Sequence, residues 1–181
     1  MKNKQLRSSI LLAITAIIWG VAFVAQTTGG DAVGPFSFNS VRFIIGSVVL
    51  LPVIFVLDKT GISRRKPETK KDYKRLLKAG LLVGVALFLA ANAQQLGIAF
   101  GAQVSKAGFL TALYILIVPI LGIFLKKKCG WNVWVGVAIS LVGMYFLCIK
   151  GSFRLELMDI SLIASAFLFS IQILLIDHYS P

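Results

Sequence analysis

Hydrophobic residues along this chain come in long blocks, not at the spacing of an amphipathic surface helix. Six blocks are nearly free of charge and are separated by shorter polar or basic connections: residues 10–28, 38–57, 79–100, 107–125, 131–149 and 160–176. Each block approaches the roughly 20 residues that a helix needs to cross about 30 Å of hydrocarbon. Because unpaired backbone groups cannot face lipid, we predict an all-α protein, a polytopic transmembrane helical bundle.

The composition agrees with a protein whose main partner is the lipid bilayer. Hydrophobic residues make up 57% of the 181 positions and charged residues only 14%, whereas soluble domains carry about 25% charged residues. The formal net charge of +12 raises the question of nucleic-acid binding. The basic residues lie between the apolar blocks, as in the loops of membrane proteins, so we expect no nucleic-acid partner.

Basic residues also predict the orientation of the chain. They gather before the first block, after the second and after the fourth, and are sparse in the other connections, which hold Lys150 and Arg154. Cytoplasmic loops of membrane proteins carry an excess of Lys and Arg. We therefore expect an integral protein of a bacterial plasma membrane with a cytoplasmic N-terminus.

A faint internal repeat divides the chain at about residue 150. Five positions of the first block match five of the sixth at this offset: Leu12, Thr15, Ala16, Trp19 and Gly20 against Leu162, Ser165, Ala166, Phe169 and Ser170. Five spans separate the copies, so they should cross the membrane in opposite directions, as in inverted-repeat transporters. We interpret residues 1–150 as a five-helix repeat and residues 151–181 as the start of a second one.

The order and spacing of several short motifs resemble the ten-helix EamA-type members of the drug/metabolite transporter superfamily. In chain order, these motifs are Trp19-Gly20 with Phe23, Pro35, Arg42-Phe43, the run from Ser105 to Thr111 with Pro119, Gly136 and Gly143, and Asp159. The resemblance implies two five-helix halves, and hence a missing C-terminal half of the same protein as a partner. The family commonly carries Leu-Gly-Glu where the fourth span ends, but here Leu125 is followed by three lysines.

Two cations near the predicted outer ends of spans are candidates for contact with a solute. Arg42 lies inside the second block and Lys106 at the edge of the fourth. Both could simply extend toward the headgroups. If instead they face a cavity, an acidic or zwitterionic solute would suit them.

Amides and aromatic residues add further cavity candidates. Asn92 and Gln95 share one helix face, and either structural hydrogen bonds between helices or a water-filled cavity would explain them. The set that we expect to line a substrate cavity is Trp19, Gln26, Arg42, Asn92, Gln95, Lys106, Thr111 and Tyr114.

Small residues predict close helix packing. Gly80 with Gly84, and Gly97 with Gly101, have the spacing that lets two helices approach closely. Pro119 is expected to kink the fourth span, because proline removes a backbone hydrogen bond.

Motifs of enzymes and metal sites are missing from the sequence. We find no zinc spacing, nucleophile elbow or phosphate-binding loop, so we expect no enzyme, no metal and no cofactor. Together with the resemblance, this favours a secondary transporter that moves a small metabolite or drug-like solute by alternating access. The alternative is a non-transporting membrane scaffold or assembly subunit.

Overall fold

The computed structural model describes residues 2–60, 67–148 and 156–180, and all regular structure in these ranges is helical. In chain order, the helices are α1 (Lys2–Val33), α2 (Pro35–Lys59), α3 (Lys70–Ala99), α4 (Val104–Ala112), α5 (Tyr114–Phe124), α6 (Trp131–Cys148) and α7 (Asp159–Tyr179). The predicted boundary near residue 150 lies outside the described residues, as do Lys150 and Arg154.

The predicted all-helical membrane architecture is confirmed. Helices α1, α2, α3 and α7 are each long and apolar enough to cross a membrane, and α4 with α5 forms a further candidate span. Helix α6 contributes a shorter apolar segment, Trp131–Phe146. The chain is therefore an integral membrane protein of the polytopic helical class.

Local sequence signals set the ends of these helices. Gly34, with φ 83°, makes the tight connection from α1 to α2, which then begins with Pro35 at a position where proline needs no hydrogen bond. Thr69 and Asp72 cap the start of α3 reciprocally. Gly101, with φ 95°, ends α3, because Ala102 N donates to Gly97 O at 3.2 Å.

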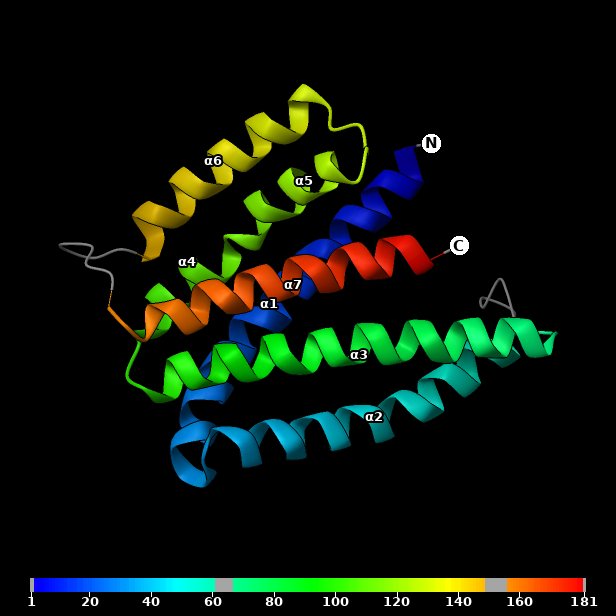
Figure 1. Cartoon of the computed structure of the whole chain (residues 1–181), viewed down its shortest axis with the longest axis horizontal. Helices are drawn as coiled ribbons and strands as arrows, with labels where there is room; N and C mark the ends of the chain where they lie inside the picture. Colours follow the sequence, from blue (N-terminus) through cyan, green and yellow to red (C-terminus); the bar gives the residue numbers. More distant parts are fainter. Residues whose placement is uncertain (1, 61–66, 149–155, 181) are drawn as a thin grey trace.

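Helix α7 lies in the middle of the bundle (Figure 1). It packs against α3, α4 and α5, while α1 contacts α2, α3 and α4, and α6 lies against α4. Figure 1 also shows that α1 and α7 run in opposite directions. This is the relative direction that the internal repeat predicts for its two copies.

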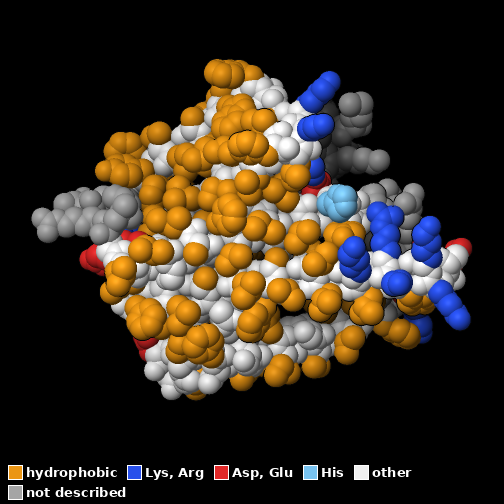
Figure 2. All heavy atoms as spheres, in the orientation of Figure 1, with side chains coloured by type: hydrophobic (Ala, Val, Ile, Leu, Met, Phe, Trp, Pro, Cys, Tyr) orange, Lys and Arg blue, Asp and Glu red, His pale blue; other side chains and the backbone are white. Residues whose placement is uncertain are grey.

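The two ends of the bundle differ in charge (Figure 2). Hydrophobic side chains cover the visible face, and Lys and Arg side chains gather at the end where the N-terminus and the C-terminus lie (Figures 1 and 2). We call this the basic end. The opposite end, where α1 finishes and α7 begins with Asp159, is called the acidic end below.

The glycines and the proline predicted to shape packing have different surroundings. Gly97 meets α7 closely, because an added Cβ would lie 2.6 Å from Leu162 Cγ. The structure departs from the expected pairing with Gly101, which lies in the turn after α3 and not on its packing face. Gly80 and Gly84 have no described atom within 4 Å of a built Cβ, so no helix packs there.

The fourth predicted span is divided into two helices. The break between α4 and α5 falls at Leu113, whereas Pro119 lies inside α5, six residues further on. Leu113 N donates to Leu110 O at 3.3 Å, so the backbone tightens locally at the junction. Pro119 itself does not mark the break.

Candidate functional site

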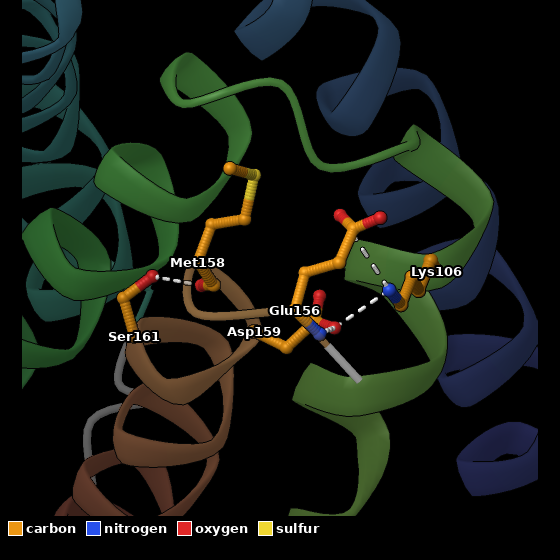
Figure 3. A network of polar contacts seen from close by, with 5 residues as sticks. All are labelled: Lys106, Glu156, Met158, Asp159 and Ser161. Carbon is orange, nitrogen blue, oxygen red and sulfur yellow. Dashed lines mark hydrogen bonds and ion pairs between the residues drawn. The ribbon is translucent and has the colours of Figure 1, made fainter. Parts of the chain in front are cut away.

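An ion-pair cluster joins α4 to the start of α7 at the acidic end (Figure 3). Lys106 Nζ lies 2.6 Å from Asp159 Oδ2 and 4.0 Å from Glu156 Oε2. The side chain of Asp159 is 1% exposed and that of Lys106 13%, whereas that of Glu156 is 58% exposed. The Lys106–Asp159 pair is therefore the buried core of this cluster, and Glu156 lies at its rim.

Backbone geometry at the start of α7 holds Asp159 in place. Glu156 N donates to Asp159 Oδ2 at 2.7 Å, and Ser161 Oγ donates to Met158 O at 2.7 Å (Figure 3). The carboxylate oxygen that faces Lys106 thus also accepts a backbone hydrogen bond. Such charge-assisted hydrogen bonds are stronger than neutral ones.

A layer of buried amides links α1, α2 and α3. Asn39 Nδ2 donates to Ala91 O at 3.1 Å and to Asn92 Oδ1 at 3.3 Å. Gln95 Nε2 donates to Gln26 O at 2.9 Å. Both predicted amides of α3 therefore contact other helices, Asn92 through Asn39 and Gln95 through the backbone of α1.

Two further hydrogen bonds continue this polar layer toward α4 and α7. Gln94 Nε2 donates to Thr111 Oγ1 at 3.1 Å, and Ser165 Oγ donates to Ala90 O at 2.8 Å. All four residues are buried. The polar layer thus links α3 to α1, α2, α4 and α7.

An aromatic group lies beside the polar layer. The ring of Phe169 on α7 is 6.3 Å from the ring of Trp19 and 6.4 Å from that of Tyr114, measured between centroids. The predicted cavity residues Trp19 and Tyr114 are therefore brought together through Phe169, which the sequence analysis did not select. Such a group offers flat apolar surfaces beside polar ones, as solute sites do.

Arg42 lies apart from the ion-pair cluster. Its guanidinium carbon is 5.1 Å from the ring of Phe43 and 5.8 Å from that of Phe38, both on its own helix α2. The side chain is half-buried. Cation–π contact of this kind steadies a guanidinium without neutralising its charge.

The two ends of the bundle also differ in packing. A hydrophobic cluster of Ile98, Ala102, Ala107, Leu110 and Leu162 fills the acidic end between α3, α4 and α7. At the basic end, a cavity of about 290 Å³ lies between α5 and α7, lined in part by Pro119, Lys127 and Asp177. Among the described residues, a packed hydrophobic cluster thus lies at the acidic end and a cavity at the basic end.

The sequence found most polar residues of this site but not their partners. Asn39, Gln94 and Ser165 were missed as site residues, although each is a polar residue inside a predicted span. Asp159 was noted only as part of a family motif. Within the described ranges, no group of three His, Cys, Asp or Glu residues could hold a metal ion.

Comparison with known proteins decides the family. The sequence profile of the EamA-like transporter family matches residues 6–149. The chain belongs to the EamA-like transporter family. The resemblance of this EamA-like chain to the drug/metabolite transporter superfamily is thereby confirmed.

Known relatives agree with this assignment. An uncharacterized transporter of Archaeoglobus fulgidus is 30% identical over 183 residues, which cover 98% of this chain and 51% of the relative. A second one from that organism is 27% identical, covering 95% and 59%, and the uncharacterized transporter YetK of Bacillus subtilis is 28% identical, covering 83% and 43%. The chain thus spans about half the length of the curated relatives it matches. No solved structure matches it significantly.

Proposed function

We propose that this EamA-like chain is part of a secondary transporter that moves a small solute by alternating access between two inverted repeats. The observation that carries the proposal is the buried polar layer between α1, α2, α3 and α4. Among the described residues, three of its buried acceptor oxygens have no hydrogen-bond partner, namely Gln26 Oε1, Asn39 Oδ1 and Gln95 Oε1, and neither has Asp159 Oδ1 in the ion-pair cluster. Polar atoms inside a membrane protein are costly and commonly mark a solute path.

We further propose an acidic or zwitterionic solute. Arg42 keeps its charge without a described carboxylate nearby, because its contacts are aromatic. Lys106 is balanced by Asp159, so a solute carboxylate would have to exchange with Asp159. A zwitterion suits this exchange. Its carboxylate would replace Asp159 beside Lys106, and its ammonium group would pair with the displaced carboxylate of Asp159.

The contrast between α1 and α7 supports a second five-helix unit as the partner. In α7, the repeat residues Leu162, Ser165 and Ala166 are buried against the first unit. Their counterparts in α1, Leu12, Thr15 and Ala16, are exposed. An inverted second unit would cover this face of α1 as the first unit covers α7.

Ligand-dependent stability tests the proposed function. The purified chain is melted with a panel of small carboxylates, zwitterions and neutral amides of matched size. A ligand at 100 times its Kd adds about 2.7 kcal/mol to the stability of the state that binds it. We expect solutes with a carboxylate to raise the Tm, and neutral amides to leave it unchanged.

Charge-removing variants make this test specific. Lys106→Gln and Arg42→Gln should reduce the rise in Tm, whereas Lys71→Gln, at an exposed cation of the basic end, should keep it. A non-transporting scaffold would show no shift with any solute of the panel. Equal shifts with neutral amides would contradict the acidic or zwitterionic preference.

A further inference from the structure

We propose that Lys106 and Asp159 form a gate that closes the acidic end of the transporter, with Asp159 as the positioning residue for the Lys106 ammonium. This inference rests on the function proposed above, because a gate has meaning only on a solute path. Asp159 was not among the predicted site residues. It acts by holding the Lys106 ammonium between α4 and α7 (Figure 3).

The location of the pair suits a gate. Lys106 lies in the first turn of α4, and Asp159 is the first residue of α7. Both helices begin at the acidic end, so the 2.6 Å ion pair bridges α4 of the predicted first repeat and α7 of the predicted second one. Separation of α4 from α7 at this end requires that this pair be broken.

The packing below the pair shows which end it closes. Ala107 and Leu110 of α4 lie against Leu162 of α7 in the buried hydrophobic cluster. The ion pair covers this cluster at the acidic end. At the basic end, a cavity of about 290 Å³ is lined by residues of both α5 and α7. The Lys127–Asp177 ion pair there is partly exposed at both side chains.

The chemistry of the pair allows the gate to open reversibly. Asp159 Oδ1 is buried and has no hydrogen-bond partner among the described residues. A buried carboxylate oxygen without a partner is unfavourable, and water or a solute donor would satisfy it when the gate opens. A purely apolar contact between α4 and α7 at this place would have no polar atom that water could stabilise when the two helices separate.

Thiol accessibility tests the gate without a known solute. In a Cys129→Ser, Cys148→Ser background, Thr111→Cys provides a buried reporter five residues beyond Lys106, about 7.5 Å along α4. Ile173→Cys, in the cavity at the basic end, provides the control reporter. The purified chain in nanodiscs is treated with a charged maleimide, which reaches both ends, so the result does not depend on orientation.

We expect Lys106→Gln and Asp159→Asn to raise the labelling rate of the Thr111→Cys reporter about tenfold, because each leaves a charge without its buried partner. Lys106→Arg keeps the charge, and Glu156→Gln removes only an exposed one, so both should stay within about twofold of the parent. The Ile173→Cys reporter should label at the parent rate in every variant.

Three results would overturn the gate. The first is an unchanged Thr111→Cys rate in Lys106→Gln and Asp159→Asn. The second is an equal rise at both reporters, which means general loss of packing. The third is an equal rise in Glu156→Gln. Labelling needs neither solute nor flux, so failure of the gate and failure of the proposed transport function are observed in separate assays.

Discussion

At the scale of single residues, Lys126 occupies a backbone conformation that suits glycine. Its φ is 59°, and it is the only non-glycine residue with positive φ in the described ranges. The last turn of α5 closes around it, with Lys126 N donating to Ile123 O at 2.8 Å and Lys127 N to Gly122 O at 2.9 Å. This is the Schellman ending, in which glycine usually takes the position of Lys126.

The departure from the family's Leu-Gly-Glu sequence therefore has a stability cost. Lys126→Gly should raise the free energy of unfolding by about 0.5–1 kcal/mol, since a non-glycine residue is strained at this φ. Lys128→Gly is the matched control, because the backbone of Lys128 is not left-handed. There glycine only adds conformational entropy to the unfolded chain, so the free energy of unfolding should stay the same or fall. Reversible unfolding in SDS-containing mixed micelles measures both. Equal effects at the two positions would contradict this interpretation.

The sequence identified polar residues of the site by type and spacing. Asn92 and Gln95 were placed on one face of a helix from their separation, and both are buried in contacts with other helices. Lys106 was selected for its charge, but its partner Asp159 was not. The two lie 53 residues apart, and periodicity carries no information about contacts between distant segments.

At the scale of helices, the contact between α3 and α7 depends on a missing side chain. A Cβ built on Gly97 would lie 2.6 Å from Leu162 Cγ and 2.7 Å from Ser161 Oγ. Contacts of this kind let two backbones approach closely and replace the hydrophobic effect that is absent between helices in lipid. Gly97 thus sets how near α7 can lie to the polar residues of α3.

Gly97→Ala should therefore lower the free energy of unfolding by about 1–3 kcal/mol, the usual effect of an added methyl group in a tight contact. Gly84→Ala is the matched control on the same helix, with nothing within 4 Å. A second change, Leu162→Ala in the Gly97→Ala background, should recover part of the loss if the clash is the cause. A loss of equal size in Gly84→Ala would indicate an effect of helix backbone alone.

The lengths of the hydrophobic blocks predicted the helices well, because the thickness of the bilayer sets the number of apolar residues in a spanning helix. The six predicted spans coincide with the helices, apart from extensions such as residues 2–9 of α1 and 70–78 of α3, which are polar and helical. The division between α4 and α5 could not be predicted, because a break at Leu113 leaves the hydrophobic run uninterrupted. Pro119 predicted a kink in the correct span, but the break lies at Leu113.

At the scale of the whole molecule, the inverted repeat stays a prediction, and one direction and one contact between helices are compatible with it. Helices α1 and α7 run in opposite directions (Figure 1), and their matched residues Trp19 and Phe169 meet at 6.3 Å between ring centroids. In an inverted repeat, two matched residues that contact each other lie near the axis that relates the two copies. Successive spans alternate in direction, so α1 and α7 would run in opposite directions even without a repeat, and the match at an offset of about 150 remains a prediction.

Orientation of the bundle in the membrane follows from its charge asymmetry. In the sequence, the excess of Lys and Arg falls at the starts of α1 and α3 and at the end of α5. These three helix ends lie at the basic end of the bundle (Figure 1). Such an excess is retained in the cytoplasm during insertion. We therefore propose that the basic end, with its cavity, faces the cytoplasm, and that the gate of Lys106 and Asp159 faces outward.

Cysteine labelling in intact cells checks this orientation with one reporter at each end. Glu68 and Gln103 are both exposed, the first just before α3 and the second just before α4. In a Cys129→Ser, Cys148→Ser background, an impermeant maleimide should label Gln103→Cys and not Glu68→Cys, because the membrane shields the cytoplasmic end. Permeabilised cells should label both to the same extent, which shows that neither thiol is blocked by the protein. Labelling of Glu68→Cys in intact cells, with Gln103→Cys protected, would mean that the basic end faces outward and that charge asymmetry does not orient this chain.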